Sequence, residues 1–243
     1  MIRFRGPLTP GVLTLRYKRF LADVVLADGR AVTAHVANPG AMTGLAEPGL
    51  DVWLSHHPGT ARKLEWSWEL CRIGNQLVGV NTLHANAVAA EAISLGQVAE
   101  LAGYHDIRRE VAYGRRSRID LLLSTPGRPK CYVEVKTVNL KRNDAACFPD
   151  AVTARGSRHL EELTEMVAAG HRAVMVFLVQ RGDCSHFAPA GDIDPVYARG
   201  LDKALAAGVE ALCYSCRLTL EGIALDRPLP LVLAGTTLLD ERP

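Results

Sequence analysis

Apolar and polar residues alternate in short runs through the first 82 residues of the chain, which hold little helical periodicity. Such alternation is the pattern of half-buried β-strands. It predicts a strand over residues 11–20, which residues 21–26 either continue or follow as a second strand, and a return strand over 31–36. Further strands are expected at 52–55, 64–70 and 76–80. About five short antiparallel strands joined by Gly/Pro turns are typical of a small barrel of the oligonucleotide-binding (OB) type.

The rest of the chain changes to longer amphipathic segments that alternate with apolar runs. The spacing predicts helices over 85–101, 155–169 and 195–208, and strands over 107–113, 118–123, 131–137, 173–180 and 209–220. The continuous apolar run at 173–180 is typical of a strand covered on both faces. We therefore expect an all-β OB-like barrel over 1–82 and an α/β domain with a mixed sheet over 83–243, whose tail from 226 onward forms loops.

Composition restricts the cellular context. Hydrophobic residues make up 48% of the 243 residues, enough for a packed core, and no window is apolar enough to span a membrane. The first residues lack the apolar stretch of a signal peptide. Six cysteines are scattered through apolar segments, and the Cys213-x-x-Cys216 pair has no partner pair, so buried thiols are expected. These features predict a cytoplasmic protein without a membrane partner.

The predicted hairpin formed by 118–123 and 131–137 carries the strongest chemical signal. Glu134 and Lys136 share one face of their strand, and Asp120 on the partner strand is in phase to meet them. Two carboxylates and a lysine suit a divalent cation beside a phosphate. The alternative is a solvated strand face, but the strands are otherwise apolar and an unpaired acid is costly to bury there. Glu91, on the apolar stripe of the helix over 85–101, lies either at the edge of that stripe or at the same patch.

Basic residues outnumber acidic ones between 104 and 158, although the net charge is only +2. A basic rim around an acidic centre suits a polyanionic substrate, and a mixed solvated surface explains the charges equally well. In the barrel, residues 17–20 interleave aromatic and basic side chains, which suits base stacking or an amphipathic strand with an aromatic residue in the core. The candidate nucleic-acid contacts are Arg16, Tyr17, Lys18, Arg19, Arg115, Arg116, Arg118, Arg155, Arg158 and His159.

Several motifs together resemble a known family. The Asp120…Glu134-Val135-Lys136 spacing is similar to the core motif of the PD-(D/E)xK restriction-endonuclease-like superfamily. Residues 16–23, 148–153 and 193–195 resemble the bacterial and archaeal sugar fermentation stimulation protein family, and the resemblance covers nearly the full length. It implies an OB-like barrel joined to a nuclease-like α/β domain, DNA binding, and a regulatory link to the use of sugars, maltose in particular. One departure is the run at 38–42, where family members usually carry hydroxyl residues.

The resemblance also implies roles for the patch. Asp120 and Glu134 would be ligands of Mg²⁺ or Mn²⁺, Lys136 the base that positions water or phosphate, and Glu91 an auxiliary acid. The first functional hypothesis is a Mg²⁺-dependent phosphodiesterase that acts on nucleic acid, most simply DNA. The second is a DNA-binding regulator of sugar (maltose) metabolism genes that keeps a nuclease scaffold without turnover. No helix-turn-helix is evident, so we expect binding without strong sequence preference, and a homodimer is compatible with the sequence.

Overall fold

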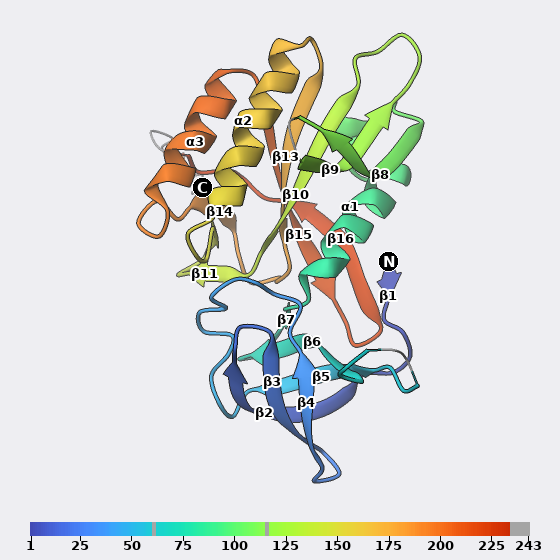
Figure 1. The fold of residues 1–243 in the computed structure, drawn as a ribbon, viewed down its shortest axis with the longest axis vertical. Helices are drawn as coiled ribbons and strands as arrows, with labels where there is room; N and C mark the ends of the chain where they lie inside the picture. The colour runs from blue at the N-terminus through green and yellow to red at the C-terminus, as the bar shows by residue number, and fades with distance from the viewer. Residues whose placement is uncertain (60–61, 115–116, 234–243) are drawn as a thin grey trace, which may run out of the picture.

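The computed structural model of the chain describes residues 1–59, 62–114 and 117–233. A β-barrel, at the bottom of Figure 1, is joined to a larger domain in which helices cover a twisted sheet. The barrel strands run in the order β4-β3-β2-β5-β6-β7, and a further pairing of β4 with β6 closes strands β2 to β6 into a barrel. Their bounds are β2 Thr9–Tyr17, β3 Leu21–Leu26, β4 Ala31–His35, β5 Asp51–His56, β6 Trp66–Ile73 and β7 Gln76–Gly79. The predicted OB-like barrel is confirmed.

The alternating run over 11–20 does not form one strand. β2 ends at Tyr17, and β3 begins as a second strand at Leu21, which pairs back with Tyr17. Lys18 and Arg19 between them both have positive φ angles, of 47° and 64°. Two successive residues with a left-handed backbone conformation form a tight turn, so the strand ends here although the polar and apolar residues continue to alternate. The side chain of Arg16 stabilises this turn, because its Nε and one terminal nitrogen donate to the carbonyl of Arg19.

The larger domain is built on a seven-stranded sheet with the order β1-β16-β15-β13-β10-β9-β8. β10, β13 and β15 are parallel to one another, whereas the other neighbours are antiparallel, so the predicted mixed sheet is confirmed. The strands are β1 Ile2–Arg3, β8 Asp106–Tyr113, β9 Ser117–Ser124, β10 Cys131–Val138, β13 Arg172–Val179, β15 Glu210–Leu218 and β16 Gly222–Pro228. A small second sheet, not predicted, contains β11 Leu140–Arg142, β12 Ala145–Phe148 and β14 His186–Pro189.

Helices lie on both faces of the large sheet (Figure 1). α1 (Ala85–Ser94) packs on one face, in a core that includes Val88, Val133 and Val176. α2 (Ala154–Ala168) and α3 (Pro195–Ala206) pack on the other face, around residues such as Phe177. This placement explains the apolar run of β13, which is covered from both sides.

The first helix is shorter than its periodicity predicts. α1 ends at Ser94, because Gly96 takes a φ of 69° and its N–H bonds to the carbonyl of Ile93, while Gln97 N–H bonds to Ala92. This pair of bonds is a Schellman motif, which closes a helix with a left-handed glycine. A separate 3₁₀ turn, η2, follows at Ala99–Leu101.

The two ends of the chain depart from the predicted division. β1 pairs with β16, so residues 2–3 belong to the sheet of the larger domain rather than to the barrel. β16 itself extends to Pro228, into the segment expected to form loops. A 3₁₀ turn, η1 (Thr82–His84), joins the barrel to α1. The six cysteines are all free and buried, as expected. Within the described ranges, no helix is long and apolar enough to cross a membrane.

Candidate metal and nucleic-acid site

The carboxylate of Asp120 lies where the ladder between β9 and β10 opens. The regular pairing of the two strands ends at Leu121 and Val133. Beyond it, Asp120 Oδ2 accepts the backbone N–H of Val135 at 2.8 Å, and Asp120 Oδ1 accepts from Asn86 Nδ2 of α1 at 2.7 Å. The carboxylate thus takes the place of the backbone carbonyl that would otherwise accept the Val135 N–H, and this bond fixes the position of the Asp120 side chain.

Asp120 is held in an environment that disfavours its charge. Burial, and then the nearby charge of Glu134, raise the pKa of Asp120 from 3.8 to about 6. The hydrogen bonds from Val135 and Asn86 and the charge of Lys136 oppose this rise without cancelling it. A carboxyl that is strained when ionised has a physical reason to attract a cation.

Glu134 is more deeply buried, with 2% of its surface exposed. Its Oε1 accepts from Lys136 Nζ at 2.7 Å and from the Nδ1–H of His159. Burial alone would raise the pKa of Glu134, but the bond from His159 and the charge of Lys136 outweigh it, so the pKa lies below its usual value. The second oxygen, Oε2, is buried and has no hydrogen-bond partner among the described residues.

His159 orients Glu134 rather than contacting solvent. Its side chain, on α2, is buried at 2% exposure. Arg155 Nε donates to His159 Nε2 at 3.2 Å, so Nε2 is the acceptor and the ring proton sits on Nδ1, facing Glu134. This arrangement corrects the prediction that His159 contacts nucleic acid, because a buried imidazole committed to Glu134 cannot reach a phosphate. Sequence spacing showed Arg155 and His159 one turn apart but could not show which strand they face.

The donors at this patch fit a hydrated hard cation. The unpartnered Glu134 Oε2 and the strained Asp120 carboxylate supply oxygen ligands, which Mg²⁺ and Mn²⁺ prefer. No group of three or more His, Cys, Asp or Glu side chains in the described residues is arranged to hold a metal ion. Mg²⁺ commonly binds through one or two carboxylates and keeps several waters, so two protein carboxylates are sufficient for it.

Glu91 does not join this patch, so the second of its predicted positions is wrong. Its Oε2 forms an ion pair with the N-terminal amine of Met1 at 2.5 Å. Asn86 is the α1 residue that bonds Asp120, and five helical positions separate it from Glu91, a rotation of about 140° around the axis. Asn86 was not among the predicted site residues. The only feature of the sequence that pointed to Asn86 was an amide side chain in the first turn of the helix that precedes the hairpin.

A cavity of about 470 Å³ runs between the barrel and the larger domain beside this patch. Lys136 and Arg155 line it from the larger domain, and Arg19 lines it from the β2–β3 turn of the barrel. Asp150 Oδ2 accepts the backbone N–H of Met42 at 3.1 Å across the junction. A Cβ on Gly40 would lie 2.2 Å from the same carboxylate, so this close approach requires glycine. The barrel loop is therefore seated against the mouth of the cavity.

The remaining predicted nucleic-acid residues fall into three groups. Lys18, Arg19, Arg118, Arg155 and Arg158 are exposed and available to an anion. Tyr17 is half-buried with its hydroxyl on Asp23 at 3.2 Å, and Arg16 donates to the carbonyls of Arg19, Asn38, Gly40 and Ala41. Arg16 therefore holds two barrel loops, and its contact with phosphate stays a prediction. Arg115 and Arg116 lie outside the described residues.

Two family models match the chain in the same order as its two domains. One, the SfsA N-terminal OB domain, matches residues 15–80, and the other, the sugar fermentation stimulation protein RE domain, matches residues 83–222. The chain belongs to the sugar fermentation stimulation protein family. A family homologue from Paramagnetospirillum magneticum is 62% identical, covering 96% of this chain and 98% of its own. One from Rhodospirillum centenum is 59% identical over 95% of this chain and 99% of its own.

Structural comparison agrees with the family. A solved structure of Pyrococcus furiosus SfsA in complex with Ca²⁺ superposes with a TM-score of 0.86 at 27% identity, covering 96% of this chain and 100% of that chain. The barrel and the mixed-sheet domain are thus shared across the length of the family fold. This confirms the predicted fold of an OB barrel followed by an α/β domain with a mixed sheet.

Proposed function

We propose that this family member binds DNA without strong sequence preference and hydrolyses its phosphodiester bonds with Mg²⁺ or Mn²⁺. One observation carries the proposal: Asp120, Glu134 and Lys136 are joined by hydrogen bonds and charge, and the cavity that Lys136 lines also carries Arg19 and Arg155. Two carboxylates beside a cavity that is lined by cations suit a metal and the phosphate that it would bind.

Each residue has a distinct part in this proposal. Asp120 and Glu134 would hold the cation, and His159 and Asn86 would keep their oxygens in place. When bound, the cation would neutralise charge on the scissile phosphate and lower the pKa of a water molecule. Lys136, released from Glu134, would carry its positive charge towards the phosphate and steady the attacking water. The P. furiosus relative, which was solved with Ca²⁺, supports the presence of a divalent cation in this fold.

The barrel supplies the second half of the binding surface. Lys18 and Arg19 project from a tight turn, and Phe20 beside them is 44% exposed. Cations with a neighbouring exposed ring are what an OB barrel uses to hold a strand by its backbone and stack a base. Phe20 therefore replaces Tyr17 as the stacking candidate, because the Tyr17 hydroxyl is tied to Asp23.

A second candidate function also has a specific observation in its favour. Glu134 Oε1 already pairs with the charge of Lys136 and accepts a hydrogen bond from His159, and both oxygens of Asp120 already accept hydrogen bonds. This network is nearly self-sufficient, as expected of a DNA-binding regulator of sugar (maltose) metabolism genes that keeps the scaffold without turnover. The two functions share the binding surface and differ only in whether the patch takes a metal.

The deciding experiment incubates purified protein with labelled single-stranded, duplex and branched DNA in Mg²⁺ and in Mn²⁺. We expect cleavage by the natural protein, none by Glu134→Gln, and none by Lys136→Ala, with DNA affinity retained in both variants. Asp106→Asn, an exposed carboxylate on the edge strand β8, is the matched control and should cleave normally. If no substrate is cut and neither metal shifts the melting curve, the regulator is the correct function.

A further inference from the structure

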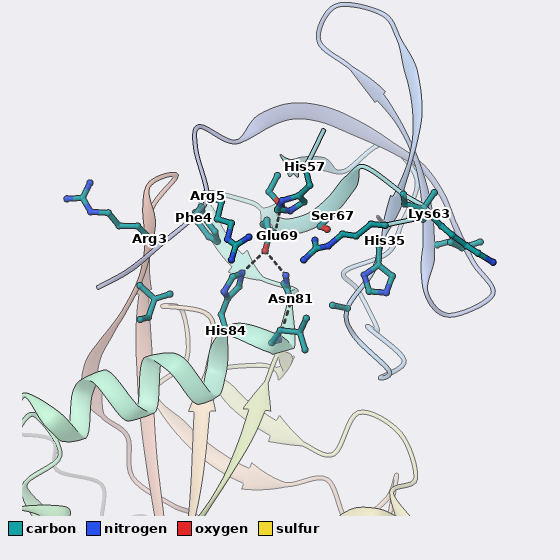
Figure 2. Close-up of a pocket in the computed structure, with 17 residues that line it drawn as sticks. Arg3, Phe4, Arg5, His35, His57, Lys63, Ser67, Glu69, Asn81 and His84 are labelled. Carbon is teal, nitrogen blue, oxygen red and sulfur yellow. Dashed lines mark hydrogen bonds and ion pairs between the residues drawn. The ribbon is translucent and has the colours of Figure 1, made fainter. Parts of the chain in front are cut away.

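A second and larger cavity, of about 790 Å³, opens between the N-terminal segment, the barrel and the η1 turn. Figure 2 shows Glu69 of β6 near the centre of the cavity, with bonds to neighbours that include His84 and Asn81. None of its lining residues belongs to the cavity beside Lys136. Its size is within the range of small-molecule sites, about 300–1,000 Å³. The proposed nuclease function does not use it.

The base of this cavity is a buried and fully engaged carboxylate. Glu69 is 4% exposed, and its Oε2 accepts from Asn81 Nδ2 at 2.8 Å and bonds His84 Nε2 at 2.7 Å. Its Oε1 accepts from the Ser55 hydroxyl at 2.6 Å. Burial raises the pKa of Glu69, but the bonds from His84, Ser55 and Asn81 outweigh it and leave the pKa below its usual value. Glu69 is therefore ionised at neutral pH.

The hydrogen bonds also fix the direction of a short polar chain. Ser55 has one hydroxyl proton and gives it to Glu69, so its oxygen accepts from His57 Nε2 at 2.9 Å. Burial and the charge of Arg62 lower the pKa of His57, so this ring is neutral at pH 7. The barrel fold does not itself require this polar network, because burying a charge costs free energy unless the charge is paired.

The walls above Glu69 are strongly basic. Arg5, Arg62 and Lys63 line the cavity with exposed side chains, and Glu69 is the only carboxylate among the described residues that line it. In Figure 2 Arg5 points towards Glu69 and His84, whereas Arg3 points away from the centre. Three cations in the lining against one paired anion give a net positive site, which attracts anions. Phe4, Leu21 and Leu64 supply apolar surface between the charges.

We propose that this cavity binds a small organic phosphate of about nucleotide size. The phosphate would lie against Arg5, Arg62 and Lys63, since arginine forks match phosphate oxygens in pairs. The ionised Glu69 at the base would repel a second anionic group, so the part of the ligand that lies nearest to it would be uncharged. An inorganic anion is too small to bridge the rim and the base. A continuous phosphodiester strand would bring a negative charge to Glu69.

The experiment titrates the full chain calorimetrically with adenosine, AMP, ADP, ribose 5-phosphate and inorganic phosphate. We expect at least one phosphate ester to bind at least tenfold more tightly than either adenosine or inorganic phosphate. Arg5→Ala combined with Arg62→Ala should weaken that ester at least tenfold, while the melting temperature without ligand stays unchanged, as both side chains are exposed. Arg30→Ala, an exposed barrel arginine paired with Asp28 and outside both cavities, should bind as the natural protein does.

Three outcomes would overturn the proposal. The first is that no ester binds at millimolar concentration. The second is that the double variant binds the ester as well as Arg30→Ala does. The third is tested by competition with an oligonucleotide. If the oligonucleotide displaces the ester, and the Arg5/Arg62 double variant no longer binds the oligonucleotide, the cavity is a nucleic-acid site. Because DNA cleavage is measured separately and uses Lys136, failure of the nuclease proposal leaves this result unaffected.

Discussion

Replacing Asp120 with asparagine should stabilise the protein at high pH and not at low pH. The side chain keeps its shape and loses its charge, and it keeps one of the two hydrogen bonds that the carboxylate accepts from Val135 and Asn86. The natural carboxylate is strained when ionised, because burial and Glu134 raise the pKa of Asp120 to about 6. The variant removes this strain along with the metal ligand.

The sign follows from the raised pKa. A carboxyl whose pKa rises on folding binds its proton more tightly in the folded state, so its contribution to stability is full below about pH 4 and is lost as the pH rises through 6. A rise of about two pKa units corresponds to about 3 kcal/mol in the free energy of unfolding. The lost hydrogen bond costs Asp120→Asn about 1 kcal/mol. The variant should therefore be about 2 kcal/mol more stable at pH 8, and about 1 kcal/mol less stable near pH 4.

Urea unfolding in a chelator at pH 4, 6 and 8 measures this difference. Subtracting the two proteins at each pH cancels the shared carboxylates that do not interact with Asp120, and the difference therefore reports Asp120 together with its coupling to Glu134. Asp106→Asn, an exposed position at the sheet edge, is the control variant in the same series. Adding Mg²⁺ at pH 8 should raise the stability of the natural protein alone, by about 2.7 kcal/mol at a hundredfold excess over Kd. If the difference in the free energy of unfolding between the natural protein and Asp120→Asn stays constant from pH 4 to 8, the Asp120 carboxylate is not strained when ionised.

Three further substitutions test neighbouring parts of the site. His159→Gln should weaken Mg²⁺ binding about 10- to 100-fold in calorimetry, because it loosens Glu134, and should leave DNA affinity intact; reduced DNA affinity would restore His159 as a contact. Arg19→Ala should reduce the slope of log affinity against log salt by about one in fluorescence anisotropy, unlike the remote Arg30→Ala; equal slopes would remove the barrel turn from the interface. Lys136→Ala should keep the Mg²⁺-induced rise in melting temperature and lose cleavage, and loss of the rise would make Lys136 a structural residue.

The fold was largely predictable because its signals are local. The pattern of apolar and polar residues in a strand depends only on which of its faces are buried. This holds for the alternation at 31–36 and 52–55 and for the continuous apolar run at 173–180. Errors arose where backbone conformation overrode the pattern: the left-handed pair Lys18 and Arg19 ended a strand, and Gly96 ended a helix. The β1–β16 pairing joins residues 2–3 to 222–223 and has no local signal.

The candidate site was predictable only where one hairpin carried it. Asp120, Glu134 and Lys136 lie on adjacent strands, so the period of two placed them together. The prediction failed for residues that reach the patch from helices. The sequence of a helix does not determine the angle at which that helix packs on a sheet, so it does not show which of its residues reach the patch. His159 was predicted to contact nucleic acid, and Glu91 to lie either at the edge of its apolar stripe or at the metal patch. In the structure His159 is buried against Glu134, and Asn86 is the α1 residue that bonds Asp120.

The segment from Asn81 to Asn86 shows why such sites escape a reading of the chain. Asn81 and His84 bond Glu69 in the larger cavity, and two residues later Asn86 bonds Asp120 at the patch. Each residue looks ordinary alone, as a turn amide or a helix-start polar group. Because η1 runs directly into α1, a displacement of His84 must be shared by Asn86. This short segment between the barrel and the larger domain therefore carries side chains that complete a site on either side.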